Sequence, residues 1–160
     1  LFDLNAGFPK LIEAPTLIAS NFVLHWLNKP EERIKEWFEA LAPNGWLAIT
    51  YPAKGSFPEW HNAAHTANVA CTALPFPSHD LLLKTINKKS IKINQLTTFT
   101  QEAAKVTSLL KPLVQVGAQA SPFKTLTISQ WKKLQEVWPI SKKTSDPKLT
   151  WLIHTMLIQK

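Results

Sequence analysis

Short apolar blocks and helical patterns alternate along the first third of the chain. Residues 16–19 form an apolar run that stops at the small polar pair Ser20-Asn21, which is typical of a buried strand. A helical pattern opens at Pro30, and residues 46–50 then form a second apolar block. Strand, helix and strand make a β-α-β unit, so we predict neighbouring parallel strands whose carboxyl ends share one sheet edge. The apolar positions of the helix fall on one face: Ile34, Trp37, Phe38 and Leu41.

The rest of the chain predicts an α/β fold with additional helices. Residues 149–158 are apolar on both faces, which favours a strand in the middle of a sheet. Thr127 and Gln130 match a capping box, so a helix should begin there and stop at Pro139. The other expected elements are a strand end at Leu1-Phe2, a helix that begins at Pro58 and ends near Pro75, helices over 78–86 and 101–110, a strand over 90–99, and loops over 117–124 and 141–148.

Composition indicates a globular chain. Of 160 residues, 45% are hydrophobic and 18% are charged, so the chain can build a core and is not of the disordered type. No apolar run is long enough to span a bilayer and no signal peptide is visible, which predicts a cytoplasmic protein. Cys71 is the single cysteine, so no internal disulfide can form. The chain starts without methionine and reads like the middle of a domain, so we expect either a single domain over 1–160 or part of a longer one.

Charge is divided unevenly between the two halves of the chain. Residues 1–80 hold five Lys or Arg and eight Asp or Glu, a net of −3, whereas residues 81–160 hold thirteen Lys and three acids, a net of +10. Two interpretations stay open for the basic half: a solvated lysine surface, or a face for an anionic partner. Nucleic acid is the weaker candidate partner, because arginine and aromatic residues are not interleaved with the lysines.

The sequence lacks the common motifs of phosphate-binding, nucleophilic and metal chemistry. Its four glycines form neither G-x-G-x-x-G nor G-x-x-x-x-G-K, and G-x-S-x-G does not occur. His61 and His65 share a helical face at i, i+4, but the glutamate of H-E-x-x-H is missing, so no metal is expected. An enzyme built from this sequence should therefore act by positioning its reactants rather than through an acid–base pair.

Three stretches resemble a known family, the class I S-adenosylmethionine-dependent methyltransferases. The first two are generic to that family, and the third resembles the subgroup that methylates malonyl-acyl carrier protein in biotin synthesis. Together the resemblance covers nearly the whole chain. The stretches are Asp3-Leu4-Asn5 with Pro9 and residues 18–21 with Trp26; residues 41–50, LAPNGWLAIT; and residues 55–61, GSFPEWH, with the segment 127–139.

The resemblance implies part of a three-layer Rossmann-like methyltransferase fold. In the family, the fourth, fifth, seventh and sixth strands lie side by side and the seventh is antiparallel. The four strands expected here match that set in chain order. The chain thus resembles the carboxyl-terminal, substrate-side half of the fold, with residues 55–88 as a helical lid. The family's glycine-rich cofactor loop is not in this sequence, so the chain by itself is expected to hold only part of the cofactor site and to be inactive alone.

The resemblance also implies a set of site residues. S-adenosylmethionine is the expected methyl donor, with the Asp3 carboxylate accepting from the adenine amino group and the Leu4 backbone donating beside it. Its methionine and methyl end is expected at Ser20, Asn21 and Phe22. The implied substrate contacts are Trp26, Gly55, Ser56, Glu59, Trp60 and His61.

The reaction implied by the resemblance is methyl transfer to the carboxylate of malonyl-acyl carrier protein. A carboxylate is already ionised at neutral pH, so alignment and exclusion of water should suffice without a general base. Two alternatives stay open: a methyltransferase for another small acceptor, and a non-catalytic remnant or interaction module that keeps the fold. The carrier protein is acidic in that family, and the expected docking residues are Lys88, Lys89, Lys92 and Lys111.

Overall fold

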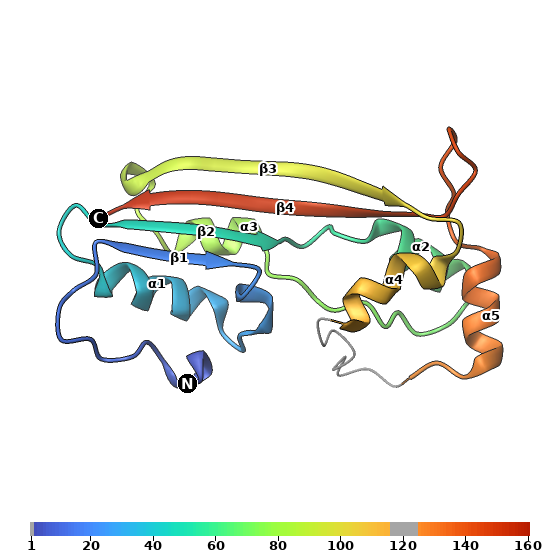
Figure 1. Ribbon diagram of the computed structural model, residues 1–160, viewed down its shortest axis with the longest axis horizontal. Coiled ribbons are helices and arrows are strands. Elements are labelled where there is room, and N and C mark those ends of the chain that lie inside the picture. The colour runs from blue at the N-terminus through green and yellow to red at the C-terminus, as the bar shows by residue number, and fades with distance from the viewer. Residues whose placement is uncertain (1, 116–124) are drawn as a thin grey trace. The chain divides into compact units, whose positions relative to one another are not determined.

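The computed structural model describes residues 2–115 and 125–160, so the predicted loop over 117–124 lies outside the described residues (Figure 1). The strands are β1 (Leu17–Asn21), β2 (Trp46–Pro52), β3 (Ile91–Glu102) and β4 (Lys148–Gln159). The helices are α1 (Pro30–Ala40), α2 (Pro58–Thr66), α3 (His79–Lys84), α4 (Val106–Gln115) and α5 (Ile128–Glu136). Three short 3-10 turns are η1 (Leu4–Ala6), η2 (Leu24–Trp26) and η3 (Lys88–Ser90).

The described strands form one four-stranded sheet in the order β1-β2-β4-β3. β1 is parallel to β2, and β2 is antiparallel to β4. The Asn94 and Thr100 side chains of β3 contact those of His154 and Thr150, so β3 is antiparallel to β4 as well. This arrangement confirms the predicted parallel pair, the central position of the last strand and the expected methyltransferase strand order.

Three predicted element boundaries are wrong. Phe2 and Asp3 lie outside any strand, because the Asp3 side chain caps η1 instead. The predicted helix over 101–110 begins only at Val106, since β3 continues to Glu102 along a partner strand that contributes contacts at Thr150 and Trp151. The helix predicted to run from Pro58 to near Pro75 ends at Thr66, just before Asn68 takes up left-handed backbone geometry with φ 51°.

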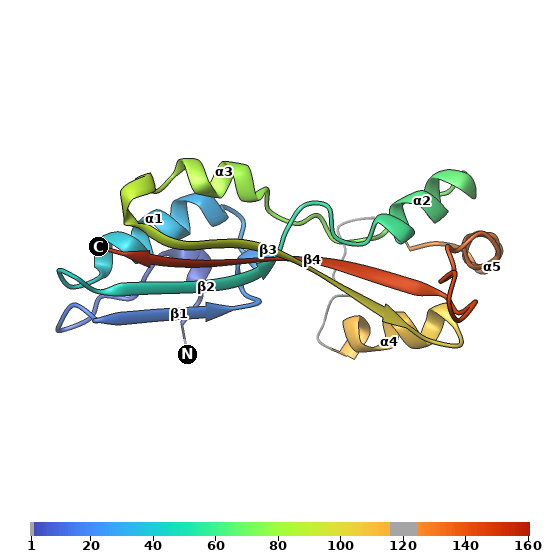
Figure 2. The same ribbon diagram turned by 90° about the horizontal axis from the view of Figure 1, so that it is seen from above.

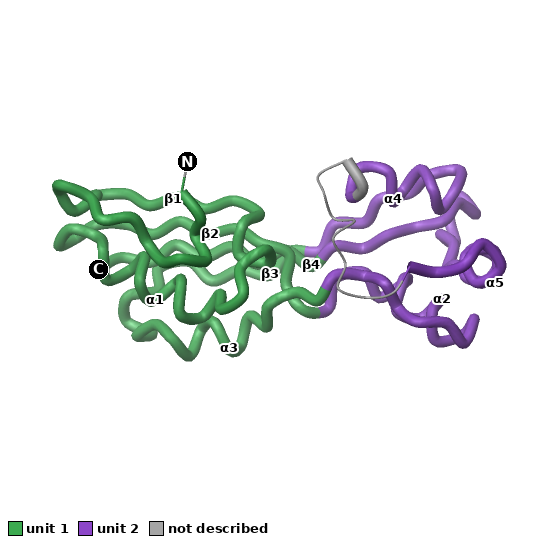
Figure 3. The backbone as a smooth tube through the Cα atoms, turned by 90° about the horizontal axis from the view of Figure 1, so that it is seen from below, with its two compact units in different colours: residues 1–54, 75–97, 152–160 green, residues 55–74, 98–151 purple. Residues whose placement is uncertain are grey.

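The chain divides into two compact units, and the first contains residues 1–54, 75–97 and 152–160 (Figure 3). In this unit α1 and α3 cover the same face of the sheet (Figure 2). The predicted apolar face of α1 is confirmed, because Ile34, Trp37 and Leu41 are each at most 2% exposed. They pack in one core cluster with residues of β2, β4 and α3, among them Leu47, Ile49, Tyr51, Leu82, Met156 and Ile158.

The second unit contains residues 55–74 and 98–151, which include α2, α4 and α5. The predicted capping box at the start of α5 is confirmed: the Thr127 side chain accepts from the Gln130 N–H, and the Gln130 side chain accepts from the Thr127 N–H. α2 and α5 contact each other, and the rings of Trp60 and Trp138 lie 6.0 Å apart between centroids. The buried aromatic side chains of this unit, Phe57 and Trp138, pack with aliphatic residues such as Leu109, Leu134 and Leu149.

Candidate functional site

The carboxyl ends of β1 and β2 form one edge of the sheet, as the β-α-β unit predicts. The Phe22 N–H, one residue beyond β1, donates to the Thr50 carbonyl at 2.8 Å. Phe22 has φ 55°, a left-handed conformation that costs a non-glycine residue about 1 kcal/mol or more. The chain turns there into η2, and the side chains of Phe22 and Trp26 remain 38% and 39% exposed. An open α/β sheet binds its ligands at this edge.

His25 occupies an aromatic cluster beside that edge. Its ring centroid lies 4.8 Å from Trp26, 5.6 Å from Phe76 and 6.3 Å from Phe22. Burial lowers the pKa of His25 to about 4, so the imidazole is uncharged at neutral pH. Its Nδ1 and the Ser20 Oγ are both buried without a hydrogen-bond partner in the described part of the chain. The sequence analysis assigned no role to His25. Two of its three aromatic neighbours, Phe22 and Trp26, are close to it in sequence, and they were the available signal that this histidine lies in an aromatic cluster.

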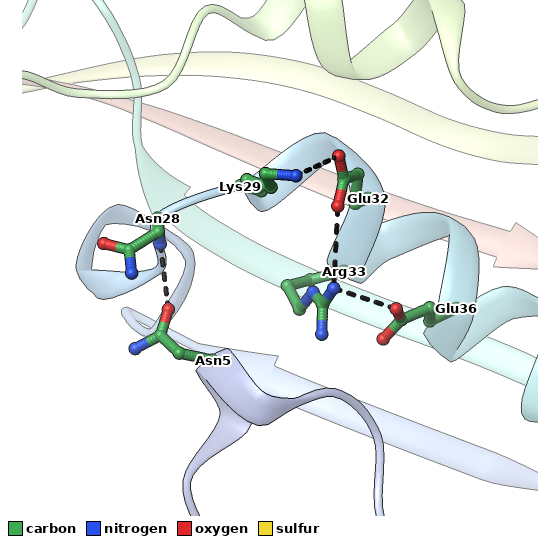
Figure 4. A network of polar contacts seen from close by, with 6 residues as sticks. All are labelled: Asn5, Asn28, Lys29, Glu32, Arg33 and Glu36. Carbon is green, nitrogen blue, oxygen red and sulfur yellow. Dashed lines mark hydrogen bonds and ion pairs between the residues drawn. The ribbon is translucent and has the colours of Figure 1, made fainter.

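The turn that carries Asp3 and Leu4 belongs to the same unit as this edge. Asp3 Oδ1 accepts from the Asn5 N–H at 2.9 Å, and Leu4 packs against the core cluster. Asn5 Oδ1 in turn accepts from the Asn28 N–H at 2.9 Å (Figure 4). The structure therefore brings Asp3 and Leu4 into one compact unit with Ser20, Asn21, Phe22 and Trp26.

A chain of polar contacts crosses the sheet from buried Tyr51 of β2 and His154 of β4 to exposed Asn94 of β3. The Tyr51 hydroxyl lies 2.6 Å from His154 Nδ1, and His154 Nε2 lies 2.6 Å from Asn94 Oδ1. Because the Asn94 oxygen can only accept, the His154 Nε2 carries the proton and its Nδ1 accepts from Tyr51. Burial lowers the pKa of His154 to about 4 and raises the pKa of Tyr51, so both groups are neutral at pH 7. No sequence motif pointed to this chain of contacts.

The five other predicted substrate contacts lie in the second unit: Gly55, Ser56, Glu59, Trp60 and His61. Gly55 has φ 108°, which only glycine adopts readily, and Ser56 is buried. His61 is exposed, and its Nδ1 lies 3.3 Å from the Sγ of Cys71, whose thiol pKa is raised by burial. The role of these residues toward a substrate stays a prediction.

Glu59 of α2 is hydrogen-bonded to Thr150 of β4. It is 5% exposed, and its two carboxylate oxygens accept from the Thr150 N–H at 2.9 Å and from the Thr150 hydroxyl at 2.6 Å. Glu59→Ala should lower the free energy of unfolding by about 2 kcal/mol, because two partly buried donors of Thr150 lose a charged acceptor. Chemical denaturation measures the change, with Glu136→Ala on the exposed side of α5 as the control within about 0.5 kcal/mol of wild type. Equal effects of the two substitutions would contradict this role for Glu59.

The four predicted docking lysines are all exposed. Because β3 runs in the direction of β2, Lys88, Lys89 and Lys92 lie at the amino end of β3, at the sheet edge opposite Phe22. Lys92 Nζ donates to the Lys89 carbonyl at 3.5 Å, so these three form one cluster in the first unit. Lys111 lies in α4 and belongs to the second unit.

The described residues contain no group of three or more His, Cys, Asp or Glu side chains that could hold a metal ion. Across 2–115 and 125–160, none of the helices has the length and apolar character needed to cross a membrane.

Comparison with known proteins relates the chain to methyltransferases. No protein-family model matches it. Malonyl-[acyl-carrier protein] O-methyltransferase of Enterobacter lignolyticus (strain SCF1) is 28% identical over 143 residues, which cover 87% of this chain and 56% of that protein. The same enzyme of Pseudescherichia vulneris is 28% identical over 123 residues, covering 75% of this chain and 49% of that protein. The chain thus spans about half the length of the curated relatives it matches.

Solved structures share the fold at low sequence identity. The Bacillus halodurans C-125 protein BH2331, described as a candidate methyltransferase, superposes on this chain with a TM-score of 0.60 at 11% sequence identity. The match covers 99% of this chain and 69% of the BH2331 chain. The YcgJ protein of Bacillus subtilis gives a TM-score of 0.58 at 9% identity, with 98% and 68% covered. These comparisons confirm the predicted resemblance. The chain has the Rossmann-like methyltransferase fold in part, and its sequence resembles malonyl-[acyl-carrier protein] O-methyltransferases.

Proposed function

We propose that this chain forms the substrate-facing part of an S-adenosylmethionine-dependent methyltransferase whose acceptor is the carboxylate of malonyl-acyl carrier protein. The observation that carries the proposal is the sequence similarity to enzymes of that name over 87% of the chain. The strand order and the exposed aromatic edge of the first unit support it. We also place the protein in the cytoplasm, where biotin precursors on a carrier protein would be methylated.

The residues at the carboxyl edge are suited to hold S-adenosylmethionine. The Asp3 carboxylate is exposed while one of its oxygens is fixed by Asn5, so it can accept from an adenine amino group. The Leu4 backbone would donate beside it. The unpartnered Ser20 hydroxyl offers a hydrogen bond near the methionine end, with Asn21 and Phe22 next to it. When bound, the cofactor supplies an electrophilic methyl group.

The chain would contribute to catalysis by aligning the acceptor carboxylate with the methyl group and by excluding water. The acceptor carboxylate is ionised at neutral pH, so the site needs no residue to remove a proton. Water would be excluded by the aromatic side chains of Phe22, Trp26 and Phe76 and by the uncharged His25. Because His25 is uncharged, it adds no positive charge that would pair with the acceptor carboxylate and lower its reactivity. From the resemblance, we propose Trp26 of the first unit as an acceptor contact and, each by itself, the residues Gly55, Ser56, Glu59, Trp60 and His61 of the second unit.

Methyl transfer tests the proposal directly. Incubation with labelled S-adenosylmethionine and malonyl-acyl carrier protein should place label on the malonyl group when the chain is joined to the unmatched portion of the Enterobacter lignolyticus enzyme, whereas the chain alone should transfer little or none. Labelling of free small acids but not of the carrier-bound malonyl group would favour a different acceptor. No transfer by either form would favour a non-catalytic module and contradict the proposal.

We further propose that lysines dock the acidic carrier protein. Replacing Lys88, Lys89 and Lys92 together by Glu should weaken carrier binding about tenfold at low salt and flatten its salt dependence, because rim charges act through long-range attraction. Lys111→Glu tests the second unit separately. Lys10→Glu, an exposed lysine outside the predicted set, is the control for the single charge reversal at Lys111. Carrier affinity that is unchanged by all of the predicted substitutions would contradict lysine docking.

A further inference from the structure

A hydrogen bond across 23 residues connects the two ends of the proposed cofactor edge. The donor is the backbone N–H of Asn28, between η2 and α1, and the acceptor is the side-chain Oδ1 of Asn5, at 2.9 Å (Figure 4). Asn5 lies within η1, next to Leu4. Asn28 follows the segment that holds Phe22 and Trp26. The contact therefore joins the turn with the proposed adenine contacts to the segment with the proposed methyl-end contacts.

Asn5 also fixes the orientation of the Asp3 carboxylate. Its backbone N–H donates to Asp3 Oδ1 at 2.9 Å, so one residue holds Asp3 with its main chain and Asn28 with its side chain. With Oδ1 occupied in this way, the second carboxylate oxygen is directed by the same turn. A carboxylate held in advance pays less ordering entropy when a ligand binds to it.

Charged side chains at the start of α1 lie beside this turn. Gly7 closes η1 with φ 117°, and a Cβ there would lie 3.4 Å from the Arg33 guanidinium. Arg33 is 9% exposed and makes ion pairs with Glu36 at 2.9 Å and with Glu32 at 3.7 Å, while Glu32 also pairs with Lys29 at 2.9 Å (Figure 4). These ion pairs therefore order the first turns of α1 beside η1. The hydrogen bond from the Asn28 N–H to Asn5 Oδ1 sets the position of η1 relative to the start of α1.

We propose that Asn5 is a positioning residue for the adenosine end of the methyl donor, acting through Asp3 and held by Asn28. This inference rests on the proposed function, because it concerns the same site. Asn5 itself need not touch the ligand. It determines affinity by keeping the Asp3 carboxylate at a fixed place relative to the carboxyl end of β1.

Three substitutions separate this role from a general structural one. Asn5→Leu removes the acceptor, whereas Asn5→Asp keeps an oxygen that can accept from the Asn28 N–H. Asn28→Ala is the matched control, since it changes the side chain and leaves the backbone donor in place. In the unliganded chain, Asn5→Leu should speed amide hydrogen exchange at Asn28 at least about tenfold, while β1 and β2 amides keep their protection.

Titration with S-adenosylhomocysteine completes the test. Asn5→Leu should raise its dissociation constant about five- to tenfold, the loss of one ordering hydrogen bond, whereas Asn5→Asp and Asn28→Ala should bind like wild type. Wild-type affinity in Asn5→Leu, or unchanged exchange at Asn28, would overturn the positioning role alone. Absence of binding by the wild-type chain would overturn the proposed cofactor site as well, and the two failures are therefore distinguishable.

Discussion

Lowering the pH from 7 to 4 should reduce the free energy of unfolding by about 3 kcal/mol through His154 alone. The pKa of His154 is lowered from an ordinary 6.5 to about 4 by burial, and a shift of this size corresponds to about 3 kcal/mol. Protonation would also turn Nδ1 into a donor, so the Tyr51 hydroxyl would have to accept from it instead of donating to it. His154 is fully buried, so water would not solvate the charge of the imidazolium.

The sign of this dependence follows from proton binding. Below pH 6.5 the unfolded chain binds a proton at His154 that the folded chain does not accept until about pH 4. Stability is therefore complete above pH 6.5, falls as the pH drops from 6.5 to 4, and changes little further from this group at lower pH. His25 acts in the same direction, because its pKa is lowered as well.

A comparison of variants isolates the contribution of His154. Denaturant unfolding of His154→Gln at a series of pH values should give a shallower slope between pH 4 and 6.5 than wild type, together with a lower stability at pH 7. His65→Gln, on the exposed surface of α2, is the control and should keep the wild-type slope. A wild-type slope in His154→Gln would show that this buried histidine is not the source of the pH dependence.

Asp3→Asn should weaken the binding of S-adenosylhomocysteine about 10- to 100-fold without unfolding the turn. An asparagine oxygen can still accept from the Asn5 N–H and cap η1, so the local structure should persist. What is lost is the negative charge, and a hydrogen bond to a charged group contributes about 1.5–3 kcal/mol. The substitution thereby separates ligand binding from folding.

Calorimetric titration of Asp3→Asn against wild type measures this loss. Glu13→Gln removes an equivalent exposed charge from the same region and should bind like wild type. Equal affinity of Asp3→Asn and wild type would remove Asp3 from the proposed adenine contact and leave it as the cap of η1 only.

The sequence was most informative where local pattern and tertiary packing agree. The helical spacing of Ile34, Trp37 and Leu41 predicted a buried face because each turn of α1 meets the same core. The last strand was predicted as central because both of its faces are apolar, and β4 does lie between β2 and β3. The length of β3 was underestimated, since pairing with a distant strand, rather than local propensity, keeps residues 100–102 extended.

The site was predictable only in part, because its polar contacts join residues far apart in sequence. Tyr51 and His154 are 103 residues apart and His154 and Asn94 are 60 apart, so neither contact leaves a local signature. The low pKa of His25 depends on burial among rings that include the distant Phe76. The strand end predicted at Leu1-Phe2 is wrong at Phe2, because the chain there leads into a 3-10 turn that the Asp3 side chain caps.

The central claim is that the carboxyl edge of the first unit holds S-adenosylmethionine, and amide chemical shifts test it most directly. Titration of the labelled chain up to millimolar ligand reports on each amide even when binding is weak. We predict saturable chemical-shift changes at the amides of Leu4, Asn21 and Phe22. These changes should share one dissociation constant and should vanish in Asp3→Ala. Shifts confined to other residues, or none at saturating ligand in a folded chain, would contradict the assignment of this edge as the cofactor site.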